Sequence, residues 1–98
     1  MENTSQHKEL FEKIFSFLQK EGATKVAVFG SYARGEEKPE SDIDILVEFS
    51  ENKSLLTLVR IERELSEFLG VKVDLLTEES ISPYLIDGIK REAKVISV

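Results

Sequence analysis

Three aspartates and a glycine–serine pair are the residues in this sequence whose types and spacing could act on a phosphorylated substrate. The set comprises Gly30, Ser31, Asp42, Asp44 and Asp74. The glycine–serine pair ends one apolar run, and the aspartates lie near the starts of two others. Carboxylates a few ångströms apart raise one another's pKa, and divalent cations between them relieve that repulsion. Because glycine lets the backbone approach a phosphate closely and serine adds a hydroxyl donor, the set predicts a metal site beside a phosphate-binding turn.

The composition narrows the choice of metal. The chain has no cysteine and a single histidine, His7, which lies in a helix-like N-terminal stretch. These facts exclude disulfides, thiolate zinc sites, cysteine nucleophiles and His-rich metal sites, and they leave no support for a Ser-His-Asp triad. Any metal must then be hard and bound through oxygen, as magnesium, manganese and calcium are. Magnesium suits such a site because it binds through a few carboxylates together with substrate phosphates.

Charge and hydropathy restrict the partners. A formal net charge of −6 argues against duplex nucleic acid as the main partner, because phosphate backbones are bound by clustered lysine and arginine. A nucleotide held through metal ions is still compatible with an acidic surface. No apolar run approaches the roughly 20 residues that cross a bilayer, and the first residues do not open a signal peptide, so we expect no membrane association and a cytoplasmic location. The length of 98 residues predicts a single domain over residues 1–98.

The elements that must position these residues follow from the hydrophobic pattern. Apolar residues at helical spacing predict a first helix that starts at a cap on Thr4 or Ser5 and ends near Gly22. Its stripe consists of Leu10, Phe11, Ile14, Phe15, Phe17 and Leu18. Residues 25–29 predict a buried strand that ends at Gly30. After a polar loop at residues 35–41, a second strand is predicted over residues 42–49. Its two faces are Ile43, Ile45, Val47 and Phe49 on one side and Asp42, Asp44, Leu46 and Glu48 on the other.

Later elements alternate in the same way. A helix is expected from a cap at Ser54 to Leu69, with Gly70 ending it, followed by a strand at residues 71–76. Its stripe would contain Leu55, Leu58, Val59, Leu65, Phe68 and Leu69. A last helix begins at Ser82-Pro83 and runs to about Glu92, and residues 94–98 predict a fourth strand. This order predicts an α/β (α+β) fold, in which helices pack on a small mixed β-sheet.

That order also predicts how the aspartates meet. A return through the loop at residues 35–41 puts the end of the first strand beside the start of the second if the two are antiparallel. The second and third strands are separated by a helix, the arrangement that favours a parallel crossover pair. If those two strands lie side by side and in phase, Asp42, Asp44 and Asp74 can face one point.

The same residues carry a resemblance to a known family. Gly30-Ser31, ten intervening residues and then Asp42-x-Asp44 are similar to the G-S-x10-D-x-D signature of the polymerase-β-like nucleotidyltransferase superfamily. The longer sequence segments at residues 29–35, 41–47 and 73–76 resemble the minimal nucleotidyltransferase (MntA-type) branch of that superfamily. The resemblance extends from the first strand to the last helix, and it implies a nucleotidyltransferase fold like the polymerase-β palm.

The resemblance implies a role for each matching residue. Asp42 and Asp44 would hold two Mg²⁺ ions, and Asp74 would complete the shell of the catalytic ion and help to activate an acceptor hydroxyl. The glycine–serine pair would hold the β- and γ-phosphates of ATP, and Arg34 is a candidate for a further phosphate contact. Members of this branch resemble antitoxins that neutralise a companion HEPN-domain ribonuclease, some by transferring AMP to a tyrosine on it. The resemblance therefore implies a Mg-dependent protein adenylyltransferase, the antitoxin of a type VII toxin–antitoxin pair, acting on a HEPN-domain toxin within a homo- or hetero-oligomer.

Other interpretations stay open at this point. The glycine–serine pair could be a plain strand-ending turn, and Glu36 or Glu37 could hold Arg34 in a surface ion pair. His7 could be a solvated residue at a helix start, and an apolar edge of the first helix could bind a partner. At the level of function, the alternatives are an antitoxin that blocks its toxin by contact alone and a transferase of the antibiotic-modifying kind with a small-molecule acceptor.

Overall fold

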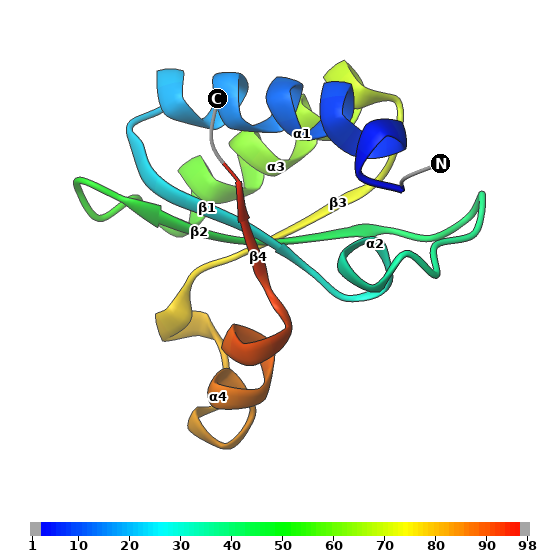
Figure 1. Cartoon of the computed structure of the whole chain (residues 1–98). Coiled ribbons are helices and arrows are strands. Elements are labelled where there is room, and N and C mark those ends of the chain that lie inside the picture. Colours follow the sequence, from blue (N-terminus) through cyan, green and yellow to red (C-terminus); the bar gives the residue numbers. More distant parts are fainter. Residues whose placement is uncertain (1–2, 97–98) are drawn as a thin grey trace.

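Four strands form one mixed sheet in the order β3-β2-β1-β4, in a computed structural model that describes residues 3–96 (Figure 1). The first strand, β1 (Ala23–Phe29), pairs antiparallel with β2 (Ile43–Phe49) and with β4 (Lys94–Ile96). β2 pairs in parallel with β3 (Val73–Leu76). Both strand directions on which the meeting of the aspartates depends are therefore confirmed.

Helices cover the two faces of the sheet unequally. The long helices α1 (Asn3–Lys20) and α3 (Leu55–Leu69) lie on one face, and α4 (Pro83–Glu92) lies on the other (Figure 1). A four-residue helix, α2 (Ser31–Arg34), follows the end of β1, and a 3₁₀ turn, η1 (Glu78–Ser80), follows β3. The expected α/β fold with a small mixed sheet is confirmed. Among the helices of residues 3–96, none has the length and apolar content needed to cross a membrane.

The alternation predicted for β2 explains how the sheet is anchored on both faces. Ile43, Ile45 and Val47 are buried in the core formed with α1 and α3, whereas Leu46 is buried on the α4 side. The first core also contains Ile14, Leu18, Val26, Val28, Ile61, Leu65, Val73, Leu75 and Ile96. Burial of apolar area on both faces holds β1, β2 and β3 in register, and with them the residues at their ends.

The helix ends follow the predicted caps at α3 and α4. The hydroxyl oxygen of Ser54 accepts a hydrogen bond from the N–H of Thr57 at 3.1 Å, and Gly70 ends α3 with a φ of 73°. The hydroxyl of Ser82 accepts from the N–H of Tyr84, and proline occupies the first turn of α4. These caps fix where α3 ends before β3 and where α4 begins.

Several expected details are wrong. α1 already includes Thr4 and Ser5, so neither residue is its N-cap. The stripe of α3 is centred on Ile61 and Leu65, which are fully buried, whereas Val59 is 48% exposed because it lies about 100° around the helix from Leu58. Leu55 and Phe68, also expected in the stripe, are 76% and 55% exposed. The third strand begins at Val73, and the fourth is described to Ile96, so its predicted last two positions lie outside the described residues.

Candidate active site

Gly30 and Asp44 are brought together by the antiparallel pairing of β1 and β2. Phe29 is the residue opposite Asp44 in that ladder, so the chain turns at Gly30 directly beside the aspartate. Gly30 has a φ of 75° and a ψ of −152°, a combination open to glycine and strained for other residues. A Cβ at this position would collide with the Asp44 carboxylate. The glycine is therefore required both by its backbone conformation and by the close approach of Asp44.

Asp44 and Asp74 face each other across the parallel pair. They are directly opposed in the β2–β3 register, as the in-phase arrangement predicted. Burial, the charge of Asp74, a side-chain hydrogen bond with it, and the charge of Asp42 together raise the pKa of Asp44 to about 6. Arg34 opposes this shift only weakly. The pair thus concentrates negative charge at one edge of the sheet without a full counter-charge.

Asp42 is the member of the predicted set that the structure does not fully bring in. It precedes β2, and its carboxylate lies 3.8 Å from the ammonium of Lys72, in a pair that is largely exposed. Within residues 3–96, no three Asp, Glu, His or Cys side chains are arranged closely enough to hold one metal ion. A cation bound by all three aspartates would have to compete with Lys72 for Asp42, although such an exposed pair is worth little.

The chemistry of the donor set nevertheless fits a hard divalent cation. The candidate donors Asp42, Asp44 and Asp74 all offer carboxylate oxygens, and burial together with the negative charges of Asp74 and Asp42 raises the pKa of Asp44. Oxygen ligands and unbalanced negative charge are what magnesium and manganese require. The metal-ligand role of these residues remains a prediction that the geometry of Asp44 and Asp74 supports.

Ser31 and Arg34 lie on α2, directly after the Gly30 turn. Ser31 is half-buried at the start of this helix, and the carbonyl of Gly30 accepts hydrogen bonds from the N–H groups of Ala33 and Arg34. The guanidinium of Arg34 is held by two carboxylates, Glu36 at 2.9 Å and Glu92. Both partners raise the pKa of Arg34, which stays charged. The surface ion pair considered for Arg34 is therefore present with Glu36, and a phosphate contact by Arg34 stays a prediction.

Glu92 is a residue at this site that the sequence pattern did not indicate. Its carboxylate accepts a hydrogen bond from the Gly30 N–H at 3.1 Å, 62 residues away in the chain, as well as from Arg34. In the sequence it is one acidic residue among many at the end of a helix. Only the packing of α4 onto the far face of the sheet brings it to the Gly30 turn.

His7 occupies a different environment from the solvated one considered above. Its ring stacks on Phe11 with centroids 5.6 Å apart and lies against Tyr32 of α2 at the same distance. Its Nε2 is 3.1 Å from the carboxylate of Glu37. Burial and Glu37 together raise the pKa of Tyr32. This cluster packs the start of α1 against α2, so His7 helps to hold the helix that follows the Gly30 turn.

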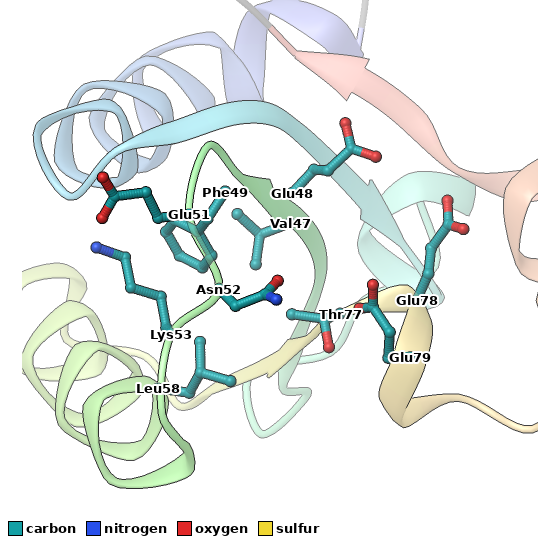
Figure 2. A pocket seen from close by; sticks show the side chains of 10 residues that line it. All are labelled: Val47, Glu48, Phe49, Glu51, Asn52, Lys53, Leu58, Thr77, Glu78 and Glu79. Carbon is teal, nitrogen blue, oxygen red and sulfur yellow. The ribbon is translucent and has the colours of Figure 1, made fainter.

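A large cavity lies away from the candidate site. Figure 2 shows it between the end of β2, the start of α3 and the η1 turn, with a volume of about 320 Å³. Val47, Phe49 and Leu58 form its apolar lining, and Glu48, Glu51, Glu78 and Glu79 form much of its rim. None of the predicted site residues lines it. The aspartates lie at the opposite ends of β2 and β3.

Metal-free stability should report the charge on Asp44. The folded-state pKa of about 6 lies above the ordinary value of 3.8, so ionisation opposes folding and the free energy of unfolding falls as the pH rises through this window. We expect Asp44→Asn to be more stable than the parent at pH 7.5 in EDTA by about 1 kcal/mol, after allowance for solvent screening, and to lose this advantage near pH 4. Urea unfolding of both proteins at the two pH values checks it. A less stable variant at pH 7.5 would show that Asp44 is not under electrostatic strain.

Comparisons with known proteins place this geometry in a family. Residues 8–96 match the family model described as nucleotidyltransferase domain. The chain belongs to the nucleotidyltransferase family. A relative from Methanocaldococcus jannaschii, provisionally named protein adenylyltransferase MJ0435, is 56% identical over 85 residues, which cover 87% of this chain and 91% of the relative. Protein adenylyltransferase MntA of Thermococcus cleftensis is 40% identical over 89 residues, covering 91% of this chain and 83% of that protein.

Solved structures agree with this assignment of fold. A provisionally named minimal nucleotidyltransferase is 37% identical, with a TM-score of 0.80 and coverage of 99% of this chain and 97% of that one. A toxin–antitoxin crystal structure with AMP-PNP has a TM-score of 0.77 at 27% identity, covering 85% of this chain and 68% of that chain. Together with the family match, these similarities confirm the resemblance to the minimal nucleotidyltransferase (MntA-type) branch that the Gly-Ser and Asp-x-Asp spacing indicated.

Proposed function

We propose that this nucleotidyltransferase transfers AMP from ATP, in a magnesium-dependent reaction, to a tyrosine hydroxyl of a companion HEPN-domain toxin, and that it thereby acts as an antitoxin. The observation that carries the proposal is the meeting of Gly30, Asp44 and Asp74 at one end of β1, β2 and β3, where all three are partly exposed. A partly exposed site suits a protein acceptor, because the tyrosine must be presented by another molecule.

The relatives support the substrate and the partner. A solved complex at 26% identity and a TM-score of 0.71 contains a tri-AMPylated HEPN toxin of Shewanella oneidensis with its MNT antitoxin. Another MntA complex, at 25% identity, carries glutamates in place of two aspartates that are separated by one residue, which is the spacing of Asp42 and Asp44 here. AMP-PNP in the related toxin–antitoxin structure supports ATP as the nucleotide.

Each residue then has a role in the transfer. Gly30 and Ser31 would hold the terminal phosphates of ATP, and Asp42, Asp44 and Asp74 would hold two magnesium ions. Bound magnesium supplies neutralisation of phosphate charge and alignment of an in-line displacement. The acceptor oxygen attacks the α-phosphorus, the bond to the bridging oxygen breaks, and pyrophosphate leaves. Asp74 takes up the hydroxyl proton as the new phosphodiester forms.

Incubation of the protein with ATP labelled at the α-phosphate, magnesium and a companion HEPN-domain protein from the same organism tests this function. We expect label on the HEPN protein at a tyrosine, and its loss in EDTA or when that tyrosine is replaced by phenylalanine. Asp44→Asn should label the HEPN protein about a thousandfold more slowly. The proposal fails if the native protein transfers no label, or if Asp44→Asn labels the partner equally well.

A purely binding antitoxin is the second candidate function, because related structures are complexes with the toxin. Co-expression of the toxin with an Asp42→Asn, Asp44→Asn double variant separates the two. If transfer is the mode of neutralisation, cells carrying the double variant should remain sensitive to the toxin. Full protection by a double variant that transfers no label would favour contact alone.

A further inference from the structure

Glu92 joins two parts of the fold that the chain keeps far apart. It is the last residue of α4, and its two carboxylate oxygens have different partners. Oε1 accepts from the Gly30 N–H at 3.1 Å, and Oε2 accepts from Nη1 of Arg34. Gly30 precedes α2 and Arg34 ends it, so one carboxylate binds both ends of this short helix.

The packing of α4 explains why the carboxylate reaches this point. Ile86 and Ile89 pack against the face of the sheet that contains Phe29 and Leu46. Glu92 follows Ile89 by less than one turn, so it lies on nearly the same side of α4 and emerges at the end of β1. Its side chain is 31% exposed, and the bonds from Arg34 and Gly30 lower its pKa. It is therefore held as a charged acceptor, in hydrogen bonds of the stronger, charge-assisted kind.

The segment that Glu92 holds is one with little rigidity of its own. Glycine has many backbone conformations of similar energy, so the residue type alone does not hold Gly30 in the one it adopts. A helix of four residues has too few internal hydrogen bonds to be stable alone. Such a backbone persists only where its surroundings determine it. The His7–Tyr32–Glu37 cluster packs against α2, and Glu92 binds both ends of this helix.

We propose that Glu92 is a positioning residue for the triphosphate: it fixes the Gly30 turn and, through Arg34, the end of α2, so that the Ser31 hydroxyl is presented beside Asp44. This rests on the proposed function, which gives Gly30 and Ser31 the terminal phosphates. In this account Arg34 acts on the nucleotide through the shape of α2. Glu36 also pairs with Arg34, whereas the Gly30 N–H donates to Glu92 and not to Glu36 within residues 3–96, which makes Glu36 a natural control.

In the alternative role, the Glu92 carboxylate would occupy the phosphate site at Gly30 and Ser31, and ATP would displace it. Displacement would cost both of its hydrogen bonds and would leave a partly buried carboxylate beside a phosphate of like charge. The positioning role avoids the loss of these hydrogen bonds, because ATP binds while Glu92 keeps its partners. The two roles predict opposite changes in nucleotide affinity.

Calorimetric titration of Mg-ATP into four variants distinguishes these roles. Glu92→Ala loses both bonds and should weaken binding about tenfold, and Glu92→Gln, which keeps an acceptor for Gly30 but loses the charge, should fall between it and the parent. Glu36→Gln should bind like the parent. Lys90→Ala removes the 2.8 Å ion pair between α4 and Glu78, and so loosens the same helix without touching the turn; it should also bind like the parent.

Each other outcome overturns the inference. Tighter binding of Mg-ATP by the Glu92 variants would show that Glu92 is an anion that ATP displaces. Unchanged binding would show that Glu92 has no role in holding the nucleotide. If Lys90→Ala loses as much Mg-ATP affinity as Glu92→Ala, and the two variants have the same melting temperature, the loss would be due to loosening of α4 and not to the Glu92 bonds. If Glu92→Ala does not fold, Glu92→Gln alone decides, because it preserves the shape of the side chain. A parent protein that binds no Mg-ATP would instead contradict the proposed function.

Discussion

Replacing Asp44 with asparagine is expected to lower the rate of nucleotidyl transfer by about a thousandfold while the protein stays folded. The change removes one negative charge from the pair that Asp44 forms with Asp74, and it keeps the shape of the side chain. Cation binding depends on that charge, whereas the β2–β3 pairing depends on the backbone. Single-turnover labelling at saturating ATP and magnesium measures the rate, and melting of the metal-free protein measures the fold.

A matched control is available on α4. Asp87 is exposed and lies outside the candidate site, so Asp87→Asn makes the same chemical change without touching the proposed metal ligands. It should retain the parental rate. The mass-action rise in melting temperature with Mg-ATP should shrink in Asp44→Asn and persist in Asp87→Asn. A full rate in Asp44→Asn, with a shift like that of the parent, would remove Asp44 from the catalytic machinery.

Gly30→Ala is expected to have the second largest effect, a loss of transfer on the order of a hundredfold. The new methyl group would collide with the Asp44 carboxylate, and the backbone at φ 75° and ψ −152° strains any residue with a Cβ. Either the turn or the aspartate must move, and displacements of about 1 Å at a reacting centre cost rates of this order. Labelling kinetics and Mg-ATP titration of the variant measure the loss.

Gly70 offers a comparison with a positive-φ glycine that has room for a Cβ; its ψ of 17° lies in the left-handed region, which is less strained for alanine than the −152° of Gly30. Its φ is 73°, almost that of Gly30, but a Cβ there meets nothing within 4 Å. Gly70→Ala should therefore cost about 1 kcal/mol of stability and leave transfer unchanged. In Gly30→Ala, removing the obstructing carboxylate with Asp44→Ala should recover part of the lost stability. Equal losses of transfer in the Gly30 and Gly70 variants would refute the collision.

Those features of the fold that depend on local pattern were predictable from the sequence. The alternation of residues 42–49 assigned Ile43, Ile45 and Val47 to one face, and the structure buries them there. The helix between the second and third strands predicted their parallel pairing, and with it the opposition of Asp44 and Asp74. Local periodicity carries this information because each side chain's direction follows from its own strand.

The features that depend on packing between distant elements were not predictable in this way. The bond between Glu92 and Gly30 requires the angle at which α4 crosses the sheet, which the spacing of its apolar residues does not determine. The pairing of Asp42 with Lys72 depends on side-chain rotamers at an exposed edge. Likewise, the exposure of Val59 follows from how α3 is rotated on the sheet, which a broad apolar stripe leaves open.

The location of the metal and nucleotide site is the claim on which the whole account depends, and paramagnetic broadening by Mn²⁺ tests it most directly. Manganese takes the same oxygen ligands as magnesium and broadens amide NMR signals according to their distance from it. Asp44 and Phe49 are separated by about 17 Å of strand, so the two ends of β2 are distinguishable. With a non-hydrolysable ATP analogue and substoichiometric Mn²⁺, the amide signals of Gly30, Asp44 and Asp74 should disappear first. Loss centred instead on Phe49, Asn52 and Lys53, at the cavity of Figure 2, would contradict the account.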